Sequence, residues 1–107
     1  MVSKIEVEIT RFVDASQPGF VECRLVDASG YKHFFVEKIP IVTLENLDAK
    51  SSFPRQGVIA CHVIERKRLD NREVFKVSTE EPWGVESMAG EVEFDVFPEQ
   101  LLELDEA

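Results

Sequence analysis

The sequence predicts an all-β protein, a small antiparallel β-barrel or sandwich of six or seven strands with one or two short helical turns. Short stretches in which apolar and polar residues alternate recur along the chain, separated by Gly, Pro, Asn or Asp, as expected for strands joined by turns. No stretch has the longer periodicity of an amphipathic helix. The 107 residues, 44% hydrophobic and 31% charged, suffice for one core, so we expect a single β domain over residues 1–107.

Three strands are predicted in the N-terminal third of the chain. Residues 4–12 and 20–26 alternate between apolar and polar side chains, and a Pro-Gly pair within residues 14–19 separates them. Residues 31–38 follow a turn at residues 27–30 that begins with Asp and ends with Gly. Because both connections are short, we expect three neighbouring antiparallel strands.

The central segment, residues 57–78, is predicted to form a long β-hairpin around which the rest is organised. Its first arm, residues 58–64, is apolar on both faces, which is typical of a strand covered on both sides. Residues 69–72 form the turn, since Asp and Asn tolerate positive φ, and residues 73–78 return. Four bases lie near the tip: Arg66, Lys67, Arg68 and Arg72. Alternate strand residues point to opposite faces, so this cluster is divided and no nucleic acid is expected to bind it.

Two segments before the hairpin have weaker patterns. Pro40 has no N–H to donate, so residues 39–42 are predicted to be an edge or the end of a strand. Residues 43–48 are predicted to form one helical turn with Thr43 as its N-cap. Residues 49–56 are expected to be a loop in which Phe53 covers the rim of the core.

The C-terminal part is predicted to hold a short strand at residues 85–88 and a last strand at residues 91–97. Pro98 suits the first position of a helix. Residues 98–107 are therefore expected to form a short helical turn or a frayed acidic tail.

Charge is distributed very unevenly. The net charge is −9; residues 1–76 contain 12 Lys and Arg against 11 acids, whereas residues 77–107 contain ten acids and no base. An acidic surface disfavours nucleic-acid phosphates and anionic membranes as partners, because both recruit Lys and Arg. It favours a basic protein partner.

The cysteines and histidines do not predict a metal site or a cofactor. Cys23 and Cys61 lie within predicted strands, and with His33 and His62 they lack the C-x2-C or H-x3-H spacing of a zinc site. The N-terminal residues have no apolar signal-peptide region, and no apolar run approaches the ~20 residues that span a bilayer. We therefore expect a cytoplasmic protein with buried reduced thiols; a Cys23–Cys61 disulfide is expected only if the protein is exported.

The leading functional hypothesis is a non-enzymatic binding module that docks a basic partner through an acidic C-terminal face, as an inhibitor, immunity or accessory subunit does. The carboxylates would steer the partner, and Trp83 would supply an aromatic contact. For Trp83 alone a core-capping position is favoured, since Trp is mostly buried in small domains. The predicted contact residues are Glu80, Glu81, Trp83, Glu86, Glu91, Glu93 and Asp95.

Two other function classes stay open. A β-barrel that binds a small molecule in its interior or mouth would be lined by Tyr31, Phe35, Phe53 and Trp83. A small hydrolase would use Ser87 or the carboxylates of residues 91–95, and would need one of these groups in a cleft. No catalytic residue is assigned.

Overall fold

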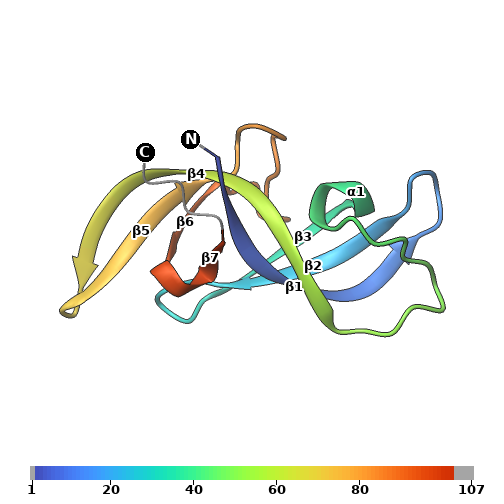
Figure 1. The fold of residues 1–107 in the computed structure, drawn as a ribbon, viewed down its shortest axis with the longest axis horizontal. Coiled ribbons are helices and arrows are strands. Elements are labelled where there is room, and N and C mark those ends of the chain that lie inside the picture. The colour runs from blue at the N-terminus through green and yellow to red at the C-terminus, as the bar shows by residue number, and fades with distance from the viewer. Residues whose placement is uncertain (1, 103–107) are drawn as a thin grey trace.

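The computed structural model describes residues 2–102, which form a curled half-barrel of seven antiparallel strands (Figure 1). The predicted all-β class is confirmed, together with one short helical turn and one 3-10 turn. The strands pair in the order β3-β2-β1-β4-β5-β6, and β7 pairs with β1. The elements are β1 (Ser3–Asp14), β2 (Phe20–Val26), β3 (Lys32–Lys38), α1 (Ile39–Val42), β4 (Arg55–Leu69), β5 (Arg72–Ser78), β6 (Glu93–Val96), the 3-10 turn η1 (Pro98–Gln100) and β7 (Leu101–Leu102).

The strand β4 connects the two parts of the sheet, as expected for the central hairpin. Residues Arg55–Cys61 pair with β1, and the later part of β4, from His62 to Leu69, pairs with β5. The hairpin turn consists of Asp70 and Asn71, with φ of 51° and 64°. Both values lie in the left-handed region that Asp and Asn tolerate better than most residues. The tip of this hairpin and the β1–β2 turn lie at opposite ends of the molecule (Figure 1).

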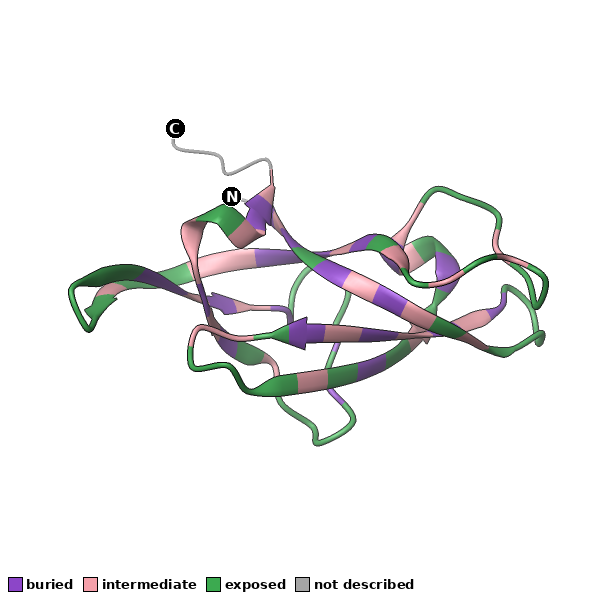
Figure 2. Cartoon of the chain, turned by 90° about the horizontal axis from the view of Figure 1, so that it is seen from below, coloured by how far each residue is buried: buried purple, intermediate pink, exposed green. Residues whose placement is uncertain are grey.

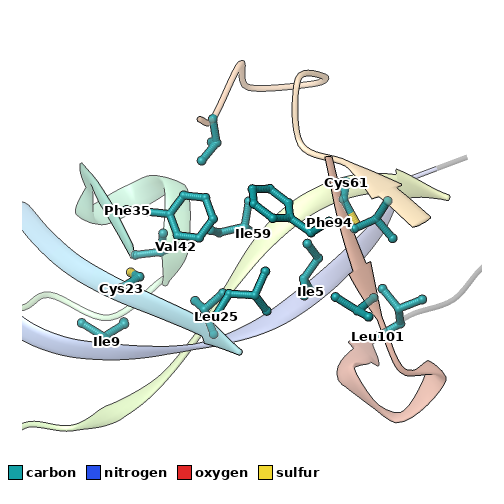
Figure 3. Packing of buried hydrophobic residues seen from close by; sticks show 14 of the residues in the cluster. Ile5, Ile9, Cys23, Leu25, Phe35, Val42, Ile59, Cys61, Phe94 and Leu101 are labelled. Carbon is teal, nitrogen blue, oxygen red and sulfur yellow. The ribbon is translucent and has the colours of Figure 1, made fainter. Parts of the chain in front are cut away.

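The sheet curls until its two end strands, β3 and β6, come together. The N–H of Ala28, just before β3, donates to the carbonyl oxygen of Asp95 on β6 at 2.8 Å. The N–H of Met88 donates to the carbonyl oxygen of Phe34 on β3, also at 2.8 Å. The rings of Phe35 and Phe94 meet edge to face inside, 5.5 Å apart, in the core drawn in Figure 3.

Alternation within the strands places the core on the inner face of the curled sheet (Figure 2). The apolar residues at every second position of β1 and β2 are buried, whereas their neighbours are half-buried or exposed. The helical turn α1 adds Ile39 and Val42, which are 5% and 0% exposed. It sits so close to β4 that a Cβ on Gly57 would lie 3.0 Å from the Val42 carbonyl oxygen and 2.8 Å from Ile9 Cδ1. Only glycine fits at position 57 without displacing these neighbours.

The predicted helical turn lies one segment earlier than expected. Residues 39–42, predicted to be the end of a strand, form α1, because Pro40 suits the first turn of a helix and the buried Ile39 and Val42 are three residues apart. Thr43 has extended φ of −160° and ends the helix instead of starting one. Its hydroxyl accepts a hydrogen bond from the Glu45 N–H at 3.1 Å.

Two C-terminal predictions also need correction. Residues 85–88 form no strand, because the N–H groups of Val85 and Ser87 donate to Thr79 and Glu91 of the same segment. After Pro98 there is only one 3-10 turn, and Leu101–Leu102 then pair with β1 because Leu101 is buried in the core. The rest of the predicted helical turn or acidic tail, residues 103–107, lies outside the described residues.

Cys23 and Cys61 are free thiols, both buried. Burial raises the pKa of each to about 12, and the charges of Glu37 and Glu22 contribute further at Cys23. No helix among residues 2–102 has the length and hydropathy to cross a membrane.

Candidate docking groove

A groove of about 600 Å³ runs beside β4, between the segment that follows α1 and the loop that carries Trp83. In Figure 1, α1 and the orange loop after β5 stand on the same side of β4. The groove has a largely apolar lining that includes Pro40, Leu44, Val58, Ala60 and Trp83. We call it the β4 groove.

Strand alternation explains why β4 contributes Val58 and Ala60 to this groove. Gly57, Ile59 and Cys61 face the core, so Val58 and Ala60 point to the opposite face, where Val58 is half-buried and Ala60 is 9% exposed. Ala60 lies opposite Lys4 on β1, which also lines the groove. The floor is therefore the outer surface of the β1–β4 pair.

Contrary to the prediction, Trp83 does not cap the core: 60% of its surface is exposed. Val85 occupies the interior position of this loop and is 0% exposed. Thr79, also fully buried, fixes the loop: its hydroxyl donates to the Val85 carbonyl oxygen at 2.6 Å, and its N–H donates to the Val92 carbonyl oxygen at 2.8 Å. With Val85 inside, Trp83 is left at the mouth of the β4 groove.

Leu44 is not among the contact residues predicted from the sequence, although it is fully exposed at 102% of its reference area. It follows directly after α1 and lines the same groove as Trp83. The sequence carried a signal, a leucine between Thr43 and Glu45 in a polar stretch. An exposed leucine by itself is common, so Leu44 becomes a candidate only because it lines the same groove as Trp83.

Three of the predicted carboxylates lie on the Trp83 loop. Glu80, Glu81 and Glu86 are exposed, and none of them makes an ion pair with another of residues 2–102. By contrast Glu45, at the groove's other wall, pairs with Arg55 at 2.9 Å. The carboxylates without an ion pair to a described residue thus lie on the Trp83 loop, beside the groove rather than in its lining.

The other three predicted carboxylates lie elsewhere, around His33. Glu91 Oε2 is 3.2 Å from His33 Nδ1, and Asp95 Oδ2 is 3.0 Å from Lys67 Nζ at the hairpin tip. The hydrogen bond to Asp95 raises the pKa of the Lys67 ammonium. Glu93 is exposed and makes no ion pair within the described part of the chain. The seven predicted contact residues therefore form two groups rather than one face.

His33 lies at the centre of the second group. It is not among the site residues predicted from the sequence. Its Nε2 is 2.9 Å from Asp27 Oδ2, so carboxylates from two segments flank its ring. The ring is 4.8 Å from that of Phe94 and 5.2 Å from that of Tyr31. These residues border an open hollow of about 450 Å³. Within residues 2–102 no three His, Cys, Asp or Glu side chains are arranged to hold a metal ion.

The four aromatic residues considered for a small-molecule site are not brought together. Phe35 is 0% exposed and Phe53 packs half-buried against the core, whereas Tyr31 and Trp83 are 68% and 60% exposed. Tyr31 borders the His33 hollow and Trp83 borders the β4 groove. Among the residues that the structure describes, they do not form one ligand cavity.

Ser87 and the hairpin bases have local roles. The Ser87 hydroxyl, 5% exposed, accepts a hydrogen bond from the Glu91 N–H at 3.1 Å and so holds a turn. Arg66 stacks on Phe75, with 5.0 Å from Cζ to the ring centroid, and Arg68 donates to the Asn71 carbonyl oxygen at 2.6 Å. Arg72 pairs with Glu99 and lies over the ring of Phe97. The basic cluster is divided, as the alternation predicted.

Comparisons of the chain with models of protein families, with curated proteins and with solved structures found no match. The groove offers apolar contacts and one large aromatic side chain, and the Trp83 loop beside it carries three carboxylates without ion pairs to described residues. Such a surface presents apolar and aromatic side chains to solvent, with carboxylates close by in the sequence.

Proposed function

We propose that this protein is a non-catalytic binding module, of the inhibitor, immunity or accessory-subunit type, that docks a basic protein partner. The observation that carries the proposal is Trp83, which is 60% exposed at the mouth of an apolar groove. Glu80, Glu81 and Glu86 surround it in sequence, and among residues 2–102 no base neutralises them. Tryptophan is enriched among the residues that dominate binding energy at protein interfaces, so an exposed Trp beside an apolar groove supports a contact site there.

The two kinds of residue have different physical roles in this proposal. Trp83 supplies buried contact area, and tryptophan is among the residues most enriched at sites that dominate binding energy. The carboxylates act over a longer range, because a patch of one sign steers an oppositely charged partner and raises its association rate. The net charge of −9 adds to that field.

Ion pairs within the described chain support a smaller set of contact residues for this proposal. Glu91 and Asp95 are engaged by His33 and Lys67, so they are less available to a partner. Glu93 lies with them, beside the His33 hollow. We therefore assign the docking contact to Glu80, Glu81, Trp83 and Glu86.

The proposal is tested by affinity capture from the native cell on immobilised protein, at ~50 mM and ~300 mM salt, because salt screens exposed charges. The variants are Trp83→Ala and the triple change Glu80→Gln, Glu81→Gln, Glu86→Gln. A control triple, Glu65→Gln, Asp70→Asn, Glu73→Gln, removes the same charge from exposed positions near the hairpin tip.

A basic partner is expected to be retained at low salt by the wild type and by the control triple. Trp83→Ala should weaken its binding by about 30-fold, since truncating such an anchor costs about 2 kcal/mol. The Trp83-loop triple should slow association by roughly 10-fold at low salt. Equal effects of the two triples, or capture indifferent to salt and to Trp83, would overturn the proposal.

A further inference from the structure

We infer that the partner enters the β4 groove as an extended, basic segment that adds a strand to the free edge of β4 at residues 58–61. This inference rests on the proposed function and names the form of the partner at the same site. It depends on three features of the groove, which are an unpaired strand edge, a limited length and a defined charge.

The first feature is the edge itself. Residues 55–61 of β4 pair with β1 on one side, and β5 begins to pair on the other side only at His62. Within residues 2–102 no strand lies along the second edge at 58–61, and the backbone hydrogen bonds of the loops do not involve these residues.

Antiparallel geometry determines what this edge offers. Alternate residues of a strand direct N–H and C=O to one neighbour, and the residues between them direct theirs the other way. Every second residue of 58–61 therefore presents its backbone N–H and C=O at the free edge of β4, beside the groove. Such groups need partners, and an unpaired edge is a ready template for another strand.

The second feature is the length of the opening. The Val42 carbonyl lies against Gly57 at one end, and Ser78 of β5 pairs with His62 at the other. Four residues of strand span about 13 Å. A short extended segment can use this edge, whereas a helix cannot, because its backbone groups are bonded within the helix.

The third feature is the chemistry of the walls. Leu44 and Trp83 flank the outer surface of β4, so alternate side chains of an added strand would contact them. Glu80, Glu81 and Glu86 lie on the Trp83 side, where no described base pairs with them. The segment that fits is thus one with small or branched apolar residues flanked by Lys or Arg.

The test uses a phage library of random octapeptides, selected on the wild-type protein and depleted on the Glu80→Gln, Glu81→Gln, Glu86→Gln triple. Selected peptides are expected to combine Lys or Arg with alternating apolar residues. Binding should shift the fluorescence of Trp83, the only tryptophan of the chain. Failure to recover any peptide that depends on Trp83 counts against the inference.

Amide hydrogen exchange then distinguishes strand addition from docking on the outer face. Bound peptide is expected to slow exchange at alternate amides of residues 58–61 by roughly 10-fold or more, with β2 amides unchanged. Two synthetic peptides are then compared, one N-methylated at its odd-numbered residues and the other at its even-numbered residues. Only every second N–H of an added strand bonds to β4, so one of the two peptides should bind roughly 10-fold or more weakly and the other should bind unchanged.

A pair of matched leucine variants tests the apolar wall. Leu44→Ala should weaken the selected peptide by about 5-fold, since one truncated leucine removes about 1 kcal/mol of contact. Leu69→Ala, at the exposed hairpin tip, should leave binding unchanged.

The outcomes separate this inference from the proposed function. Binding that needs Trp83 and the three carboxylates but leaves residues 58–61 unprotected overturns strand addition and keeps the docking role. Binding that needs neither Trp83 nor the carboxylates overturns both.

Discussion

At the scale of single residues, the two thiols show how position in a strand controls chemistry. Cys23 and Cys61 are 0% exposed on the inner faces of β2 and β4. Removing a thiolate from water is costly, so burial raises the pKa of each thiol to about 12. The thiolate is the reactive form, and the native protein holds both cysteines as neutral apolar residues.

Both thiols are therefore expected to be unreactive toward a disulfide reagent at about pH 8 in the native state, and to react on unfolding. Because the folded pKa is raised from 9.0 to about 12, their contribution to stability is complete below pH 9 and is lost as pH rises toward 12. The check is a thiol titration with and without denaturant, followed by urea unfolding between neutral and alkaline pH. Rapid labelling of either cysteine in the folded protein would contradict the expectation.

The difference between Trp83 and Val85 also belongs to the residue scale. General burial preference favours Trp83 for the interior, yet Val85 is inside and Trp83 is outside. Which of the two side chains is buried depends on Thr79, whose hydroxyl and N–H donate hydrogen bonds to the carbonyl oxygens of Val85 and Val92. A burial preference of one residue type cannot reveal such an arrangement, because the arrangement depends on residues that contact each other only after folding.

At the scale of elements, the Trp83 loop is anchored by one buried hydroxyl. Replacing Thr79 by the isosteric Val removes the donor and leaves the Val85 carbonyl oxygen unsatisfied in the interior. We expect Thr79→Val to lower the free energy of unfolding by about 1–3 kcal/mol and to weaken partner binding through Trp83. Urea unfolding measures the first effect and peptide affinity the second. Ser78→Ala, which removes a longer bond on the exposed side, should cost less than about 0.5 kcal/mol; equal losses would refute this role of Thr79.

The elements that the sequence predicts well are those with local causes. The hairpin of β4 and β5 follows from apolar alternation and from Asp70 and Asn71, which adopt the expected positive φ. The strands β1, β2 and β3 are likewise predicted by the alternation of apolar and polar residues. The turns between them are predicted by the Pro-Gly pair and by the segment that begins with Asp and ends with Gly. The prediction of a strand at residues 85–88 is wrong, because their backbone N–H groups bond to Thr79, Glu91 and Phe34. The bond to Phe34 joins segments far apart in the sequence, so no local sequence pattern could indicate it.

The candidate site was predictable only in part for the same reason. The acidic bias of residues 77–107 indicates Glu80, Glu81 and Glu86 as candidate contact residues from the sequence alone. The β4 groove was not predictable, since Leu44, Val58 and Trp83 come from three separate segments. Nor was the engagement of Asp95 by Lys67, which depends on how the hairpin lies against β6.

At the scale of the whole molecule, the half-barrel is held closed where β3 and β6 meet. Two backbone hydrogen bonds, from Ala28 to Asp95 and from Met88 to Phe34, cross this junction. His33 adds side-chain contacts, since its nitrogens face Asp27 from the turn before β3 and Glu91 from the segment before β6. Its side chain is only 9% exposed and packs against Phe94. The acidic hollow around His33 is thus explained as part of the closure.

His33→Phe is expected to keep the ring packing and remove both polar contacts, so the junction should open more readily. Hydrogen bonds to charged groups contribute about 1.5–3 kcal/mol, and we expect a loss of that size in urea unfolding. Native-state exchange should also speed up at the amides of Ala28 and Met88, which cross the junction. His62→Phe on β4 serves as the control, because its ring makes no polar contact with the other described residues. If His33→Phe unfolds like the wild type, or if exchange rises equally over all strands, His33 does not hold the two edges of the sheet together.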